Sequence, residues 1–90
     1  MDFDWDPRKA QANLTKHRVS FHEAATVFGD PLAITYPDPD HSEGESRFIT
    51  FGISTQGRLL VVGHTEYRGM IHIITARTAT RAERKIHEEG

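Results

Sequence analysis

Several features that define common enzyme classes are missing from this chain of 90 residues. It has no cysteine, which excludes disulfides and thiolate metal sites and fits a reducing compartment. No apolar run approaches the roughly 18 residues of a membrane span, and the acidic N-terminus MDFDWDPRK has no signal-peptide pattern. There is no glycine-rich phosphate loop and no nucleophile elbow. We therefore expect one cytoplasmic domain, residues 1–90, with no cofactor and no metal.

The net charge of −2 averages two regions of opposite sign. Residues 1–45 carry four basic and nine acidic side chains, whereas residues 46–85 carry seven basic and two acidic ones. Six of those seven basic residues are arginine, whose planar guanidinium binds phosphate oxygens in pairs. The mean charge excludes a general basic coat for nucleic acid. It leaves open a local arginine patch that binds phosphate, or simply a solvated charged surface.

Capping patterns and apolar periodicity predict the secondary structure. Asp6-Pro7 has the pattern of an N-cap followed by a first-turn proline, and capping-box spacing recurs at Ser20 and Thr80, each followed three residues later by glutamate. The predicted order is β-α-α-β-β-β-β-α, over residues 3–5, 8–17, 21–28, 32–36, 47–54, 59–67, 70–76 and 81–89.

Two short turns, at residues 55–57 and 68–69, predict that the last three strands form an antiparallel meander. Helices beside an antiparallel sheet define an α+β fold. Strict alternation in strand 70–76 places His72 and Ala76 on one face and Ile73 on the other. The long strands turn polar toward one end, so we expect a covered sheet with one open margin that is suited to a site.

An ordered series of motifs resembles the BrnT family of small bacterial toxins. The series is F-x-WDPRKAQANLTKH-x-VSF-x-EAATVFGDP, E-x-R, GR-x-L-VV-x-HTE and I-x-IITAR-x-A-x-x-ER, and it covers roughly residues 3–87. The resemblance implies a RelE-like fold and a metal-independent endoribonuclease that cleaves RNA and arrests growth. It also implies a ribbon-helix-helix antitoxin of BrnA type as partner, in a hetero-oligomer that contacts operator DNA only through the antitoxin.

Three residues depart from the pattern that the resemblance implies. Arg18 stands where a glycine is common, His72 where an arginine is usual, and His87 where relatives often carry a tyrosine. The last two fall near the candidate site. A second function therefore stays open, in which the chain is a degenerate toxin without activity and serves as a co-repressor or interaction module in a DNA-binding complex.

The candidate catalytic residues follow from the chemistry of RNA cleavage by the 2′-hydroxyl, which needs a base, an acid and cations at the phosphate. The matched motifs place Arg77 first, His64 and Glu66 as acid–base candidates on one strand face, and Arg68 and Arg84 as cations. The structural alternatives are Arg77 as a clamp of the strand–helix turn, His64 as a partly buried, hydrogen-bonded histidine beside a surface Glu66, and Arg84 in a salt bridge.

Four further residues are predicted to bind RNA: Arg47, Arg58, Arg81 and His87. For Arg47, an ion pair with Glu43 or Glu45 is an equal alternative. The acidic residues and one histidine of the turn-rich segment 37–46 resemble a metal site in composition, but we interpret them as solvated charge. They are Asp38, Asp40, His41, Glu43 and Glu45.

Overall fold

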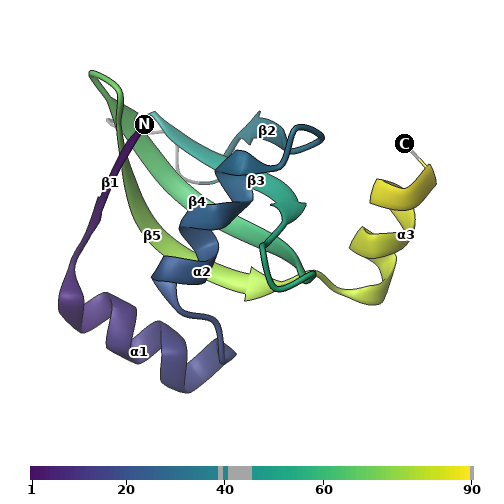
Figure 1. Ribbon diagram of the computed structural model, residues 1–90, viewed down its shortest axis with the longest axis horizontal. Coiled ribbons are helices and arrows are strands. Elements are labelled where there is room, and N and C mark those ends of the chain that lie inside the picture. The colour runs from purple at the N-terminus through teal and green to yellow at the C-terminus, as the bar shows by residue number, and fades with distance from the viewer. Residues whose placement is uncertain (39, 41–45, 90) are drawn as a thin grey trace.

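The computed structural model describes residues 1–38, 40 and 46–89. The order of helices and strands is the predicted one (Figure 1). The elements are β1 (Asp2–Trp5), α1 (Pro7–His17), α2 (Phe21–Thr26), the 3₁₀ turn η1 (Val27–Gly29), β2 (Ile34–Pro37), β3 (Arg47–Ile53), β4 (Leu59–Tyr67), β5 (Met70–Thr78) and α3 (Arg81–Glu89). His41, Glu43 and Glu45 lie outside the described residues.

The five strands form one mixed sheet in the order β1-β5-β4-β3-β2. The strands from β2 to β5 pair antiparallel, as predicted for the meander, whereas β1 pairs parallel with β5. A parallel neighbour needs a long connection rather than a tight turn, and here most of the chain separates β1 from β5. The α+β class is confirmed, and one parallel edge strand is added to the predicted antiparallel sheet.

The capping residues begin the helices as predicted. The Asp6 carboxylate accepts a hydrogen bond from Arg8 N at 2.8 Å, and Ser20 Oγ accepts one from Glu23 N at 3.0 Å. At α3 both halves of a capping box are present: Glu83 N donates to Thr80 Oγ1 at 3.1 Å, and Thr80 N donates to Glu83 Oε1 at 2.9 Å. These bonds satisfy backbone donors that the first helical turn leaves unpaired.

The main core lies between one face of the sheet and the N-terminal helical segment, in which α2 crosses that face while α1 lies below the sheet in the view (Figure 1). It is built from apolar side chains of the α1–α2 junction, α2, η1, β4 and β5: Val19, Phe21, Ala24, Val27, Leu60, Val62, Ile71, Ile73 and Ala76. The edge strand is fixed to this core by ring contacts, with Phe3 5.5 Å from Phe28 and Trp5 6.0 Å from Phe21 between centroids.

A β-bulge interrupts the pairing of β4 with β5. Gly63 pairs with Thr75, but the next residue, His64, pairs with Ile73, so Ile74 has no partner across the ladder. Because of this extra residue, Ile73 and Ala76 both belong to the core. The strict alternation predicted for this strand was therefore wrong, since a shift of one residue exchanges the two faces.

Candidate functional site

The face of the sheet opposite α1 and α2, which we term the open face, carries both apolar and arginine side chains. The register across the strands places on it Ile34, Tyr36, Arg47, Ile49, Phe51, Val61, Thr65, His72 and Arg77. Apolar groups stay exposed there: Tyr36 is 50% exposed and Ile34 is 41% exposed. Helix α3 lies apart from the other two helices and borders this face (Figure 1).

Arg77 lies at the end of β5, in one row across the sheet with Val61 and Phe51. Its guanidinium forms a paired contact with Glu83 of α3, Nη1 to Oε1 at 2.7 Å and Nη2 to Oε2 at 3.0 Å, and Nη1 also donates to the Thr78 carbonyl at 3.3 Å. This ion pair raises the pKa of Arg77 and, as the largest cause, lowers the pKa of Glu83 to about 2. Both side chains are therefore charged at neutral pH.

The guanidinium of Arg77 still has hydrogen-bonding capacity. An arginine has five N–H donors, and Glu83 and Thr78 take three of them. Nε–H and one Nη2–H, which lie on the same edge of the planar group, donate to nothing in the described part of the chain. Such an edge matches two oxygens of a phosphate, so the ion pair with Glu83 orients Arg77 without saturating it.

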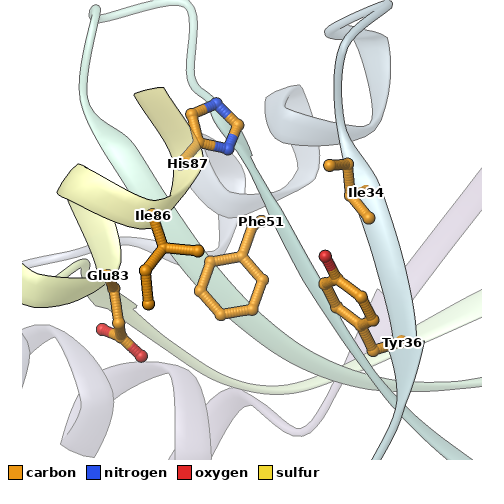
Figure 2. Close-up of a pocket in the computed structure, with 6 residues that line it drawn as sticks. All are labelled: Ile34, Tyr36, Phe51, Glu83, Ile86 and His87. Atoms are coloured by element: carbon orange, nitrogen blue, oxygen red, sulfur yellow. The ribbon is translucent and has the colours of Figure 1, made fainter. Parts of the chain in front are cut away.

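A pocket of about 290 Å³ opens next to this ion pair, between α3 and strands β2 and β3 (Figure 2). Its walls are mostly apolar, and its lining residues are Ile34, Tyr36, Phe51, Glu83, Ile86 and His87. The Phe51 ring lies in the middle of the group (Figure 2), with the Tyr36 ring edge-on at 6.0 Å. Flat aromatic walls next to a cation are suited to an unstacked base with its phosphate.

His64 and Glu66 lie on the other side of the sheet from Arg77. They share a face, as predicted, but it is the face with the helices: His64 is 1% exposed and packs between the rings of Phe28 and Phe48. Its Nε2 is 2.7 Å from Thr50 Oγ1, and burial lowers the pKa of His64 to about 4. Glu66 is exposed. The structure therefore does not bring this pair together with Arg77.

The guanidinium of Arg58 forms hydrogen bonds within the chain. Its Nε donates to Glu23 Oε2 at 3.0 Å, and its Nη2 donates to Glu23 Oε1 and, at 3.1 Å, to the carbonyl of Arg18. The Glu23 side chain is 3% exposed and also accepts a bond from Ser54 Oγ at 2.7 Å. This network joins the β3–β4 turn to α2, so the guanidinium of Arg58 is committed to the fold.

The remaining predicted cations come from the β4–β5 hairpin, α3 and the start of β3. Arg68 is at the tip of the β4–β5 hairpin with φ of 50°, and its guanidinium carbon is 5.2 Å from the centre of the Tyr67 ring. Arg81 and Arg84 are exposed on α3, and His87 lines the pocket. Arg47 is at the start of β3, and its Nε is buried with no hydrogen-bond partner among the described residues.

A second polar group on the open face was not selected from the sequence as a site. The Nδ1 atom of His72 is 2.7 Å from Asp4 Oδ1, across the parallel pair of β5 and β1. The register continues this row through Thr65 to Arg47. The sequence singled out His72 as a departure from the family pattern near the candidate site but gave it no role and no partner. Nothing local predicts a partner 68 residues away.

Metal-binding geometry was tested over the described residues only. Within them, no group of three or more histidine, aspartate or glutamate side chains lies close enough together to hold an ion. Among the described helices, none is long and apolar enough to span a bilayer.

The chain is a small α+β domain with arginines on the open face of its sheet. The crystal structure of the Brucella abortus ribonuclease toxin BrnT is similar to it, with a TM-score of 0.70 and 20% identity, over 90% of this chain and 99% of that one. This likeness establishes the fold. The chain belongs to the BrnT family, described as ribonuclease toxins of type II toxin–antitoxin systems, whose model matches residues 5–83. A comparison with curated proteins gave no match.

Proposed function

We propose that this member of the BrnT family is an endoribonuclease that cleaves RNA on its open face without a metal ion, using the RNA 2′-hydroxyl as nucleophile. The observation that supports it most directly is Arg77, held by Glu83 with one donor edge free, next to a pocket with aromatic walls. A phosphodiester at that edge would place an adjoining base against Phe51. Fixed cations stabilise the charge that develops on the phosphate in the transition state.

The other cations would extend the contact of Arg77 to further phosphates of the RNA strand. From Arg77 to Arg47 the register spans two strand spacings, about 10 Å, and four residues along β3, about 13 Å. A short single strand therefore reaches both residues, and Arg68, Arg81, Arg84 and His87 lie around it as further backbone contacts. We assign His64, Glu66 and Arg58 to other roles, because they lie on the helix side or are bound to Glu23.

The same face suits a protein partner. Exposed apolar side chains next to arginines favour a segment that offers apolar and acidic groups together. We propose that the partner is a ribbon-helix-helix antitoxin of BrnA type, that its acidic docking segment covers the open face, and that the complex contacts operator DNA only through the antitoxin. Both proteins would act in the cytoplasm, where the RNA is.

The test compares two substitutions in one ion pair. Arg77→Ala removes the phosphate contact, and we expect cleavage of a labelled single-stranded RNA to slow by about 10²–10³-fold. Glu83→Gln is the comparison, because the amide oxygen can still accept the bond from Thr80 N while the charge opposite Arg77 is lost. It should slow cleavage by a smaller factor than Arg77→Ala does, because Arg77 keeps its charge and loses only the partner that orients it. Both assays are run with a chelator, which should leave the wild-type rate unchanged.

Each outcome has a defined meaning. Equal losses in the two variants would show that Arg77 serves only to anchor α3. A rate that disappears in chelator and returns with a divalent cation would contradict metal independence. A folded wild-type chain that leaves RNA intact, both as the purified protein and in growing cells, would refute the proposed ribonuclease activity.

A second candidate function is supported by one observation, the burial of His64, which removes the expected acid–base group from the open face. In that case the chain is a co-repressor. It would leave RNA intact but increase the affinity of its antitoxin for operator DNA, which a gel-shift titration with and without the chain measures.

A further inference from the structure

We propose that His72, held by Asp4, is the base that removes the proton from the RNA 2′-hydroxyl, next to a phosphate bound by Arg47. This inference deepens the proposed RNA cleavage and rests on it. It places the proton transfer at the β1 side of the open face and leaves Arg77 and the pocket to bind the adjoining part of the strand.

The four side chains of this site form one row across four neighbouring strands. Arg47 of β3 pairs with Thr65 of β4, Thr65 with His72 of β5, and His72 with Asp4 of β1. Side chains directly opposite each other in a sheet have Cβ atoms about 5 Å apart and lie on the same face. Arg47 and His72 are thus two steps apart, about 10 Å between backbones, and a phosphodiester fits between their long side chains over Thr65.

The contact with Asp4 prepares the imidazole for this task. A neutral imidazole has one N–H and one lone pair, and the carboxylate takes the N–H at Nδ1, 2.7 Å away. The lone pair is then on Nε2, at the other side of the ring, where no contact is formed with the described residues. A carboxylate that fixes a histidine in this way sets its tautomer and orientation, as in catalytic triads.

Stability alone does not account for this pair. The side chains of His72 and Asp4 are 42% and 57% exposed, and an exposed ion pair contributes about 0–1 kcal/mol. The edge strand is already held by the rings of Phe3 and Trp5.

Arg47 completes the site because its guanidinium is not engaged elsewhere in the described structure. Its side chain is half-buried. Its Nε is buried with no partner among the described residues, so the Nη groups are the ones that would donate to a phosphate. Three elements contribute charged or titratable groups around His72. Asp4 of β1 and Arg47 of β3 lie in the same row as His72, and Asp2 of β1 and Tyr67 of β4 lie in the next row.

The proposed step balances without any further reactant. Nε2 of His72 accepts the 2′-hydroxyl proton while the 2′-oxygen forms a bond to phosphorus and the bond from phosphorus to the 5′-oxygen breaks. The products are a 2′,3′-cyclic phosphate and a 5′-hydroxyl. The leaving 5′-oxygen takes a proton from water, and the imidazolium returns its proton to the hydroxide so formed.

The test uses the whole chain and a labelled single-stranded RNA. His72→Gln should slow cleavage by about 10²-fold or more, because a general base contributes that much, while the dissociation constant of an uncleavable 2′-deoxy strand changes by less than two-fold. Asp4→Asn should slow cleavage by about tenfold, as loss of an orienting partner does. His22→Gln is the matched control, an exposed histidine on the helix side next to Trp5.

The pH profile separates a base from a structural residue. The wild-type rate should rise with pH to a plateau, because Nε2 must carry a free lone pair to act as the base, and the rate of His72→Gln should lose that rise.

Failure of this assignment differs from failure of the proposed function. If the wild type cleaves RNA and Arg77→Ala does not, an unchanged rate and pH profile in His72→Gln overturns the role of His72 alone. A loss of affinity equal to the loss of rate would also overturn it, because His72 would then only bind. A wild-type chain that leaves RNA intact refutes both proposals. Thermal unfolding of each variant confirms that the fold is intact.

Discussion

His64 is buried in a position where its charge is disfavoured. Thr35 Oγ1, Thr50 Oγ1 and His64 Nε2 form a chain of two hydrogen bonds of 2.7 Å each, while the buried Nδ1 has no hydrogen-bond partner within the described part of the chain. Burial lowers the pKa of His64 to about 4, below the usual value of 6.5. In an unfolded chain the same imidazole takes up its proton earlier as the pH falls. The folded state therefore loses stability as the pH falls from about 6.5 to about 4.

We expect this titration to account for much of the acid sensitivity of the protein above pH 4.5. The free energy of unfolding should fall by up to about 1.4 kcal/mol per pH unit between pH 6 and pH 4. His64→Gln can keep a hydrogen bond to Thr50 but does not titrate, so urea unfolding of this variant should show a much flatter dependence over that range. His22→Gln should keep the wild-type slope. A wild-type slope in His64→Gln would show that other groups are responsible.

For single residues, local motifs predicted the place of a residue within its helix or strand better than its burial and its contacts. The Thr80–Glu83 spacing predicted a capping residue, and the structure adds that the same carboxylate binds Arg77. The HTE motif gave the shared face of His64 and Glu66 but could not show that the helices cover it. Burial depends on packing between distant segments. The pairing of His72 with Asp4 has the same origin.

Among the elements, α2 and the β3–β4 turn are joined by the buried carboxylate of Glu23. That side chain accepts bonds from Arg58 and Ser54, and the guanidinium of Arg58, as the largest cause, lowers the pKa of Glu23. Arg58 also donates to the carbonyl of Arg18, which ends α1 in the left-handed conformation with φ of 59°. Three segments therefore depend on one guanidinium.

We expect Arg58→Ala to lower the free energy of unfolding by about 2–3 kcal/mol, because it leaves the buried carboxylate of Glu23 without its charged partner. The affinity for a 2′-deoxy strand should stay within two-fold of the wild type. Arg84→Ala, an exposed arginine on α3, is the control for stability and should change it by less than about 0.5 kcal/mol. Weaker RNA binding by a folded Arg58→Ala protein would restore the role in RNA binding that the sequence suggested.

The bounds of helices could be predicted more closely than the pairing of strands. Caps are local signals: Asp6, Ser20 and Thr80 begin three helices as expected. The bulge opposite Gly63 and the parallel pairing of β1 come from long-range fit and have no local signal. Even so, the order of elements and the meander followed from the sequence, because two short turns leave antiparallel pairing as the simple solution.

In the whole molecule, the proposed function depends on which face a charge occupies rather than on the net charge of −2. Arg77 and Arg47 share the open face with two carboxylates, because Glu83 binds Arg77 and Asp4 lies in the same row as Arg47. Charges separated by more than a Debye length, about 8 Å at physiological salt, are largely screened from one another. A strand on the open face would therefore respond to these local charges, while charged residues on the outer side of α1 would have little effect.

The salt dependence of RNA binding tests this division between faces. For a single strand, the logarithm of the association constant falls with the logarithm of salt concentration, with a slope of about 0.7 per neutralised phosphate. We expect Arg47→Gln and Arg77→Gln each to reduce that slope by about 0.7, when an uncleavable 2′-deoxy strand is titrated at several salt concentrations. Arg8→Gln removes the same charge from the exposed surface of α1 and should leave the slope unchanged. A reduction by Arg8→Gln equal to that of Arg77→Gln would mean that RNA binding follows net charge, and it would refute the open face as the RNA-binding surface.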